Sequence, residues 1–252
     1  MLAGERQQKI LDLIQTNGSV KVSQISTMFQ VTEKTIREDL EKLEKRQLLK
    51  RIHGGAISIH KQINILTEEQ SINNMLSEKE AIAEAALKHI RPNDIIALDA
   101  GSTSLEIAKK LEIFPLTVVT NDLMIIRELC LRDEIRLVVP GGYKQSNMLI
   151  HNDNTEWIEQ LNIHKLFLTT SGIHLEFGLS IFNKSLIPLK KALLKASKEV
   201  ICIADHRKFN KGALFTFAAL EEVNLFITDE GVQPSVHKEL LFNQKLEIAT
   251  TT

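Results

Sequence analysis

Apolar residues recur at helical spacing through the first part of the chain. Ile36, Leu40 and Leu43 fall at i, i+4 and i+7 and predict one buried stripe on a helix that begins after Thr32. Thr32 is a favourable N-cap, and Val31 before it can pack against Ile36. The same spacing predicts two earlier helices. The first covers residues 5–16 and ends at Asn17-Gly18, and its packing face holds Ile10, Leu11, Leu13 and Ile14. The second is short and capped by Ser23, and its apolar face holds Ile25, Met28 and Phe29.

The third predicted helix carries polar side chains at its start, outside the buried stripe. Only Gln30 and Val31 separate it from the second helix, which is the spacing of a helix-turn-helix. The second helix of that motif enters the major groove of DNA and contacts base edges with its N-terminal residues. We therefore expect contacts with double-stranded operator DNA from Ser23, Thr32, Lys34, Thr35 and Arg37.

Residues 48–57 alternate around Gly54-Gly55 and predict a β-hairpin, so the three helices and the hairpin together indicate a winged helix-turn-helix. Residues 1–60 carry ten Lys and Arg against seven Asp and Glu, a net charge of +3, whereas the remainder carries 21 against 25, a net charge of −4. Phosphate contacts supply most sequence-independent DNA affinity. We expect such contacts from Lys50, Arg51, His53 and Gly54. The alternative is a helix-turn-helix that docks another protein.

The chain divides by composition into a DNA-binding domain over residues 1–57, a polar linker over 58–76 and a larger domain over 77–252. The two cysteines, Cys130 and Cys202, fit a reducing compartment without disulfides. Neither a signal peptide nor an apolar run of about 18 residues is evident, so we expect a cytoplasmic protein that does not enter a membrane.

The larger domain alternates short apolar runs with helical segments, which is typical of an α/β fold with a parallel or mixed sheet. The predicted strands are 95–98, 116–119, 135–139, 166–168, 200–204 and 225–227, and the predicted helices lie near 77–90, 105–111, 123–131 and 188–197. Strand after strand is followed by Asp, Ser, Thr, Asn or Gly. Ligands of open α/β sheets bind at these carboxyl ends, so the ends of the strands are the expected binding site.

The segment from Asp99 to Thr103 has the residues of an anion-binding turn. Gly101 permits close backbone approach, Ser102 and Thr103 carry hydroxyls, and a helix begins there. Asp99 would repel a phosphate, so we assign it to sugar hydroxyls.

Both domains resemble the DeoR family of bacterial sugar-responsive repressors. In residues 5–57 the resemblance is carried by Arg6, Val31-Thr32, Thr35-Ile36-Arg37, Asp39-Leu40, Leu43 and His53-Gly54-Gly55-Ala56. In the larger domain it is carried by Asp99, Gly101-Ser102-Thr103, Thr120-Asn121, Gly141-Gly142, Gly172, Gly178, Lys190-Lys191, Asp205 and Lys208-Phe209. The resemblance implies a sensor domain similar in fold to ribose-phosphate isomerases, which binds a phosphorylated sugar or polyol that releases the repressor from its operator.

The effector site expected from these motifs comprises Asp99, Gly101, Ser102, Thr103, Thr120, Asn121, Gly141, Gly142, Lys190, Asp205 and Lys208. Lys190 or Lys208 would supply the charge opposite the phosphate. Thr120 and Asn121 could instead cap the following helix, and Gly141-Gly142 could form a plain turn. The chain departs from the family at Glu38, at the uncharged residues 70–74 and at Leu186, so the phosphate site carries over better than the sugar specificity.

The sequence leaves three alternative functions open. The first is a ligand-controlled repressor, which would bind paired half-sites as a homo-oligomer because one reading helix gives limited specificity. The second is a sugar-phosphate isomerase with a DNA-binding appendage, but no glutamate follows the strands to act as its base. The third is an architectural DNA-binding protein whose larger domain only dimerises. We expect no catalytic residues, cofactor or metal site, since the histidines and cysteines lack metal-ligand spacing.

Overall fold

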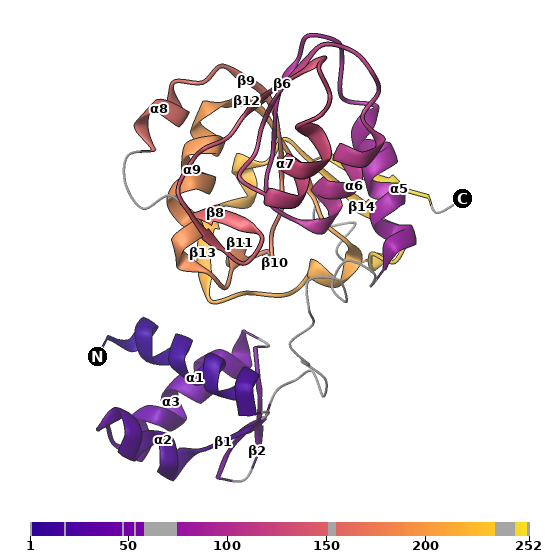
Figure 1. The fold of residues 1–252 in the computed structure, drawn as a ribbon. Helices are drawn as coiled ribbons and strands as arrows, with labels where there is room; N and C mark the ends of the chain where they lie inside the picture. Colours follow the sequence, from indigo (N-terminus) through magenta and orange to yellow (C-terminus); the bar gives the residue numbers. More distant parts are fainter. Residues whose placement is uncertain are drawn as a thin grey trace.

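The computed structural model describes residues 2–17, 19–46, 48–52, 54–57, 75–150, 155–234 and 245–250. They form a small N-terminal domain and a larger α/β domain (Figure 1). The predicted linker lies almost wholly outside the described residues, and the larger domain begins with a helix at Leu76. None of the described helices has the length and apolarity to cross a membrane.

The N-terminal domain combines three helices with a three-stranded antiparallel sheet. Its elements are α1 (Ala3–Asn17), β1 (Ser19–Lys21), α2 (Val22–Phe29), α3 (Glu33–Lys45), β2 (Lys50–Ile52) and β3 (Gly55–Ile57). The hairpin of β2 and β3 confirms the predicted wing. Strand β1 was not predicted, and it pairs with β3 on the side away from β2.

Helix α3 forms as its sequence predicts. Ile36, Leu40 and Leu43 are at most 1% exposed and lie in one core with residues of α1, α2 and the wing. The Thr32 hydroxyl accepts from the backbone N–H of Thr35 at 3.2 Å, which confirms the N-cap. Val31 packs against the same core.

The predictions for α2 were wrong in two respects. The N-cap is Lys21 and not Ser23, because β1 runs directly into the helix and brings its first turn forward. The Ser23 carbonyl instead accepts from the hydroxyls of Ser26 and Thr27. Met28 is 61% exposed, since the buried side of the helix is set by Val22, Ile25 and Ser26.

A buried ion pair joins the first and third helices. Arg6 Nε donates to Asp39 Oδ2 at 2.5 Å, and Gln7 Nε2 donates to Asp39 Oδ1 at 3.0 Å. Asp39 is 2% exposed, so these donors satisfy a carboxylate that burial would otherwise penalise.

A seven-stranded parallel sheet forms the centre of the larger domain, in the order β15-β14-β12-β9-β4-β5-β6. These strands are β4 (Ile95–Leu98), β5 (Leu116–Val119), β6 (Ile135–Val138), β9 (Ile163–Leu168), β12 (Ser197–Ile203), β14 (Leu225–Asp229) and β15 (Lys245–Ala249). All six strands predicted from apolar runs are present. The fold class is confirmed, and β15 was not predicted.

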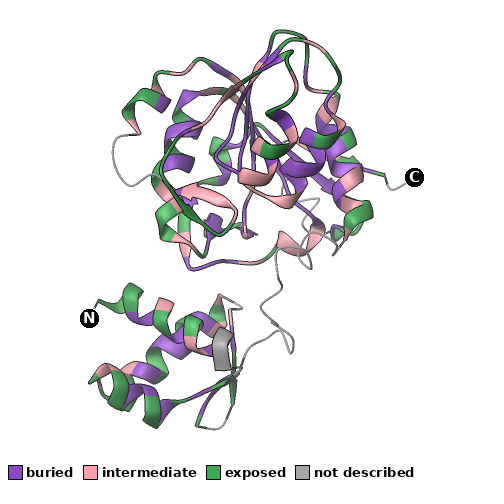
Figure 2. Ribbon diagram, viewed as in Figure 1, coloured by how far each residue is buried: buried purple, intermediate pink, exposed green. Residues whose placement is uncertain are grey.

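Two hydrophobic cores cover the two faces of this sheet (Figure 2). The helices α5 (Leu76–Leu87), α6 (Ser102–Lys110) and α7 (Leu123–Leu129) pack on one face. The other face is covered by α8 (Glu156–Glu159), α9 (Ile187–Ala196) and a small antiparallel sheet of β10 (Gly172–His174), β11 (Gly178–Ile181) and β13 (Phe215–Ala218). Neighbouring residues within one strand alternate between the cores, as Ala97 and Leu98 do.

Several short elements complete the domain and were not predicted. A hairpin of β7 (Tyr143–Gln145) and β8 (Met148–Ile150) follows β6, and three 3-10 turns, η1 (Lys184–Leu186), η2 (His206–Lys208) and η3 (Leu220–Glu222), connect later elements.

The order of strands reverses at β4. The chain first adds β5 and β6 on one side of β4 and then places β9, β12, β14 and β15 on the other. Ligands of open parallel sheets bind at such a reversal, outside the carboxyl ends of the strands. A ligand site is therefore expected among the residues that follow β4 and β9.

Candidate DNA-binding and effector sites

The start of α3 presents its polar side chains to solvent. Lys34 and Arg37 are exposed, and the hydroxyls of Thr32 and Thr35 lie 2.9 Å apart. Arg37 pairs with Glu33 at 2.6 Å, but its side chain is 63% exposed. Exposed pairs of this spacing contribute only about 0.3–0.5 kcal/mol, so Arg37 can leave Glu33 for a base or phosphate.

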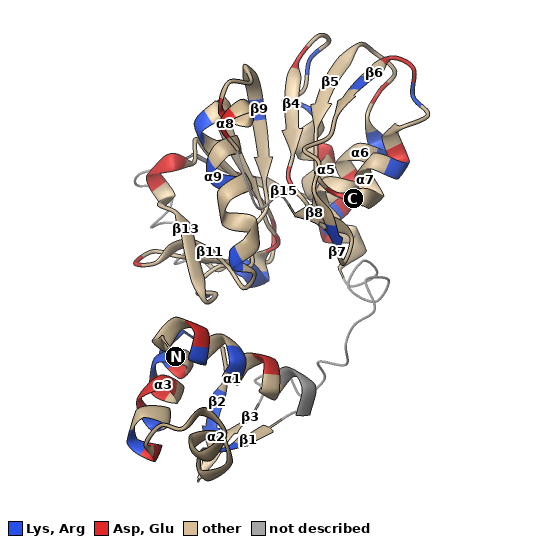
Figure 3. Ribbon diagram, turned by 60° about the vertical axis from the view of Figure 1, so that its left-hand side comes forward, with Lys and Arg blue, Asp and Glu red and all other residues tan. Residues whose placement is uncertain are grey.

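The wing is less positive than its sequence indicates, because an acidic residue of α3 neutralises one of its cations. Figure 3 shows where charged residues lie along both domains. Lys50 and Arg51 are both exposed on β2, but Arg51 Nε donates to Glu44 at 2.6 Å. Hydrogen bonds from the backbone and side chain of Arg51 lower the pKa of Glu44. Gly54 adopts a positive φ of 78° at the turn, and His53 lies outside the described residues.

Asp99 and Lys190 form a buried pair at the reversal of the sheet. Asp99 follows β4, and its Oδ2 accepts from the backbone N–H and the hydroxyl of Thr169, the residue after β9, at 2.9 and 2.8 Å. Lys190 of α9 donates to the same carboxylate oxygen and to the Thr169 carbonyl. Both side chains are about 5% exposed or less, so here each neutralises the other. Their expected roles toward hydroxyls and phosphate stay predictions.

The anion-binding turn lies directly beside this pair. Gly101 is the N-cap of α6, and a Cβ at this position would lie 2.9 Å from the Thr169 methyl group, so glycine is needed for close approach. Helix α6 has no side-chain cap. The Gly101 backbone N–H bonds to the buried carboxylate of Asp122, so the N–H groups that a ligand can approach are those of the residues after Gly101. Ser102 is half-buried and Thr103 is 8% exposed at this end. Binding of an anion at this turn stays a prediction.

Thr120 and Asn121 do not cap α7, contrary to one interpretation of the sequence. Asp122 is the N-cap, and it accepts from the N–H groups of Met124 and Ile125. The Thr120 hydroxyl accepts from the Asp122 N–H at 3.2 Å, and the Asn121 amide donates to the Leu149 carbonyl at 3.0 Å. Both residues are 2% exposed. They support the turn and the β7–β8 hairpin, and a contact with the effector stays a prediction.

Gly141 and Gly142 follow β6, the edge strand two places from β4. Both are exposed, and a Cβ at Gly141 would meet no atom within 4 Å. They lie in the irregular segment between β6 and β7, and a contact with the effector stays a prediction.

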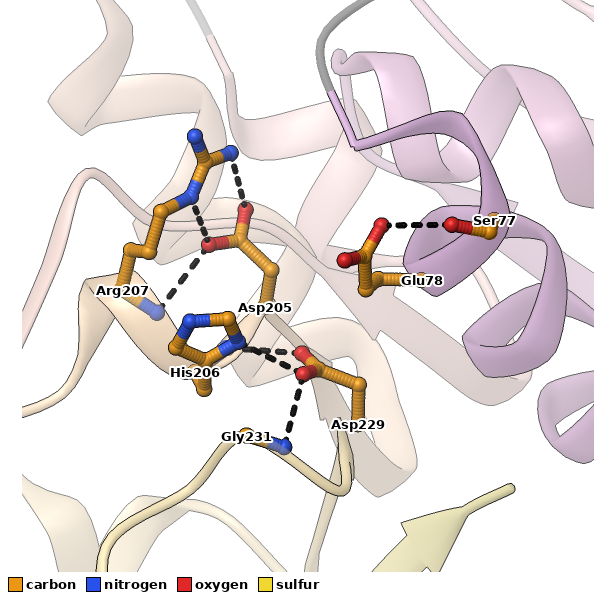
Figure 4. A network of polar contacts seen from close by, with 7 residues as sticks. All are labelled: Ser77, Glu78, Asp205, His206, Arg207, Asp229 and Gly231. Atoms are coloured by element: carbon orange, nitrogen blue, oxygen red, sulfur yellow. Dashed lines mark hydrogen bonds and ion pairs between the residues drawn. The ribbon is translucent and has the colours of Figure 1, made fainter. Parts of the chain in front are cut away.

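Cations from two elements, here called the cation cluster, act on Asp205, which follows β12, and Figure 4 shows its pairing with Arg207. Asp205 is 3% exposed and accepts from Arg207 Nε at 3.0 Å, while Lys208 lies in the same 3-10 turn. Burial lowers the pKa of Lys208, and the Asp205 charge opposes that shift. Lys79 of α5 joins the cluster, since burial lowers its pKa and the charges of Asp205, Arg207 and Lys208 act on it. An arriving anion would stabilise these cations.

Lys79 was not predicted as a site residue, although the spacing of apolar residues in its helix could have indicated that it is buried. Lys79, Ile82, Ala83 and Ala86 fall at i, i+3, i+4 and i+7, and all are buried. A lysine on the buried stripe of a helix requires a polar surrounding, which here is the cluster at the ends of the strands.

His206 was also missed, and it closes the turn after β12. Its Nδ1 lies 2.6 Å from Asp229 Oδ2, and its backbone N–H donates to Asp229 Oδ1 at 2.8 Å (Figure 4). The Gly231 N–H donates to Oδ2 as well. The 2% exposed Asp229 therefore ties the end of β14 to the cation cluster. Among the described residues, no group of histidine, cysteine and acidic side chains could hold a metal ion.

Comparison with known proteins identifies both domains. The DeoR-like helix-turn-helix domain matches residues 6–62, and the DeoR C terminal sensor domain matches residues 74–230. The chain belongs to the DeoR family. It is a DNA-binding transcriptional regulator with a C-terminal sensor domain, as the sequence predicted.

Relatives match this DeoR-family chain along most of its length. An uncharacterized HTH-type transcriptional regulator, YulB of Bacillus subtilis, is 38% identical over 95% of this chain and 94% of its own. The transcriptional repressor AccR of Agrobacterium fabrum is 33% identical over 91% of this chain and 90% of its own. Ribose 5-phosphate isomerase A of Methanocaldococcus jannaschii is similar at 15% identity and a TM-score of 0.39, over 52% of this chain and 53% of that chain, too distant to carry an argument.

Removing the charge of Lys190 should destabilise the sensor domain. Lys190→Met leaves the buried Asp99 without its cation, so we expect the free energy of unfolding to fall by about 3–5 kcal/mol. Urea denaturation followed by circular dichroism measures the loss. Lys191→Met is the matched control, because Lys191 is exposed on the next position of α9 and should change stability by about 0.5 kcal/mol or less. Equal effects of the two substitutions would contradict a stabilising role for the pair.

Proposed function

We propose that this DeoR-family regulator represses genes of sugar or polyol metabolism and that a phosphorylated sugar or polyol controls its DNA binding. The observation that carries the proposal is the uncapped start of α6 at the reversal of the sheet. The backbone N–H groups after Gly101 favour a phosphate, and Lys79 and Lys208 favour negative charge.

In the proposed complex, the phosphate binds at Gly101, Ser102 and Thr103. The sugar hydroxyls face Asp99 and Asn121, which have carboxylate and amide oxygens to accept from them. Asp99 is engaged with Lys190 and Thr169 in this structure, so the hydroxyls add to an existing network. That network fixes the carboxylate and favours ligands whose hydroxyls match its position.

The isomerase alternative has less support. Proton abstraction beside a carbonyl needs a base within reach of the substrate. Asp99 is held by Lys190, and Glu106 of α6 is 3% exposed and paired with Lys109 at 2.8 Å. Conversion of ribose 5-phosphate by the purified protein would favour the isomerase.

The reading of bases by Arg37 can be separated from phosphate contacts. Arg37→Ala should lose about 1–3 kcal/mol of operator binding and tolerate changes at one base pair, because a bidentate contact to a base is lost. Lys50→Ala should weaken all sequences similarly and reduce the salt dependence. Competition titrations with operator variants at several salt concentrations measure both effects. If Arg37→Ala and Lys50→Ala weaken binding equally for all operator sequences, Arg37 does not read a base.

The phosphate site can be tested through ligand-induced stabilisation. Saturating glycerol 3-phosphate, fructose 1-phosphate or ribose 5-phosphate should raise the melting temperature of the parent, with about 2.7 kcal/mol gained at a hundredfold excess over Kd. Thr103→Val should abolish the shift and keep DNA binding. Thr117→Val, at a half-buried position in β5, is the control. If none of the sugar and polyol phosphates shifts melting of the parent, the proposed effector class is wrong.

We also propose a homo-oligomer, at least a dimer, assembled through the sensor domain. Paired reading helices would contact half-sites about one helical turn of DNA apart, or a multiple of it. Light scattering at micromolar concentration should give at least twice the mass of one chain. A monomer, both with and without operator DNA, would rule the proposal out.

A further inference from the structure

A side chain of the sensor domain completes the core of the DNA-binding domain. Leu214 precedes β13, is 5% exposed and belongs to the hydrophobic cluster of Ile10, Ile36, Leu43 and their neighbours. Phe215 packs against the same cluster. The two domains therefore share one small core.

The reading helix is attached at this point. Arg46, the C-cap of α3, donates from Nη1 to the Leu214 carbonyl at 2.8 Å. Its guanidinium also lies over the Phe177 ring, 5.6 Å from the centroid. Arg46 is at the opposite end of α3 from Thr32, and α2 lies on the side of the domain away from the sensor in both views (Figures 1 and 3). The contact with the sensor thus leaves the reading end open.

The segment before Leu214 is held tightly against the small sheet. The Lys211 N–H donates to the Ile173 carbonyl at 3.2 Å, and the Ala213 N–H donates to the Ser180 hydroxyl at 2.7 Å. A Cβ at Gly172 would lie 2.4 Å from the Lys211 carbonyl oxygen, so the segment and β10 approach each other as closely as glycine allows. These contacts fix the segment to β10 and β11.

The other end of the segment lies in the cation cluster. Asp205 and Lys208 belong to the expected effector site, and Phe209 forms a parallel bridge with Ile173 of β10. Residues 205–214 thus run from the cluster through η2 and then along the small sheet from Phe209 to the contact with Arg46.

We propose that residues 205–214 are the relay by which effector binding changes the position of the reading helix. The relay rests on the proposed function, because it needs an anionic effector at the cation cluster. The phosphate of an effector attracts Lys208 away from the Asp205 carboxylate and so shifts the segment, and Leu214 with Arg46 carries that shift to α3. A ligand can move an equilibrium only through such differential contacts.

The relay predicts a reciprocal effect that needs no known effector. A duplex selected from random DNA by the full-length protein is bound, and hydrogen exchange of the amides of residues 205–213 is measured with and without it. In the parent, DNA should change this exchange about fivefold or more, the lower end of common coupling factors. In Arg46→Ala and in Leu214→Ser, which still bind the duplex, the change should fall to about twofold or less.

Two control variants are matched to these substitutions. Arg132→Ala removes an arginine that also donates to a backbone carbonyl, that of Leu111, but within the sensor domain. Leu175→Ser alters a leucine that is 48% exposed and outside the shared core. Both controls should respond to DNA as the parent does.

A second measurement uses fructose 1-phosphate and glycerol 3-phosphate. Any change in operator affinity that they cause in the parent should be lost in Arg46→Ala, while the ligand-induced rise in melting temperature stays. The relay is overturned if DNA leaves exchange at 205–213 unaltered in the parent, or if both variants keep the parental responses. A protein that binds no DNA would overturn the proposed function itself, which is a separate and directly visible result.

Discussion

The buried contact between Asp99 and Lys190 is the interaction on which the sensor domain depends. It joins the end of β4 to Thr169 after β9 and to α9 on one face of the sheet. A pair of this kind contributes little net stability, because desolvation of two charges offsets their attraction. Other arrangements of the two side chains are unfavourable, however, because each buried charge would carry a large desolvation penalty without the other. The pair therefore specifies where β4, β9 and α9 meet.

The position of the proposed ligand site follows from this meeting point. The strand order reverses between β4 and β9, so the connections that leave their carboxyl ends diverge. Helix α6 begins at the reversal, and Gly101 lets its first turn approach Thr169. The cations of α5 and η2 converge on the same end of the sheet. Topology thus gathers groups that are far apart in the sequence, and no single motif creates the site.

Sequence reasoning succeeded where local patterns decide the structure. The stripe of α3 and the apolar strands β4 and β5 have the predicted bounds, because burial and capping act within a few residues. The sequence predictions failed where a strand forms only by pairing with a segment that is distant in the sequence. Strand β10 has a single central apolar residue, Ile173, and forms only because β11 and Phe209 lie beside it. The Ser23 cap failed for the same reason, since β1 forms only by pairing with β3.

The site shows the same division between local and distant causes. Gly101, Ser102 and Thr103 lie at a helix start as predicted, because glycine, hydroxyls and a helix start are adjacent in the sequence. That Asp99 and Lys190 neutralise each other could not be foreseen, because they come from different elements and meet only in the folded sheet. Lys79 shows that a charged residue on the otherwise apolar stripe of a helix is itself evidence of a buried polar site. The pattern alone could have indicated its burial, although not its partners.

The shared core of the two domains has a consequence for DNA recognition. A domain joined only by a polar linker would sample many orientations, and an oligomer built on the sensor would present its reading helices at no fixed spacing. Leu214 and Arg46 replace that freedom by packing and a hydrogen bond. Half-site spacing is read by geometry, so an oligomer needs such a fixed attachment to discriminate operators. The attachment involves the end of α3 that is far from Thr32, so the orientation of the helix is fixed without covering the surface proposed to contact bases.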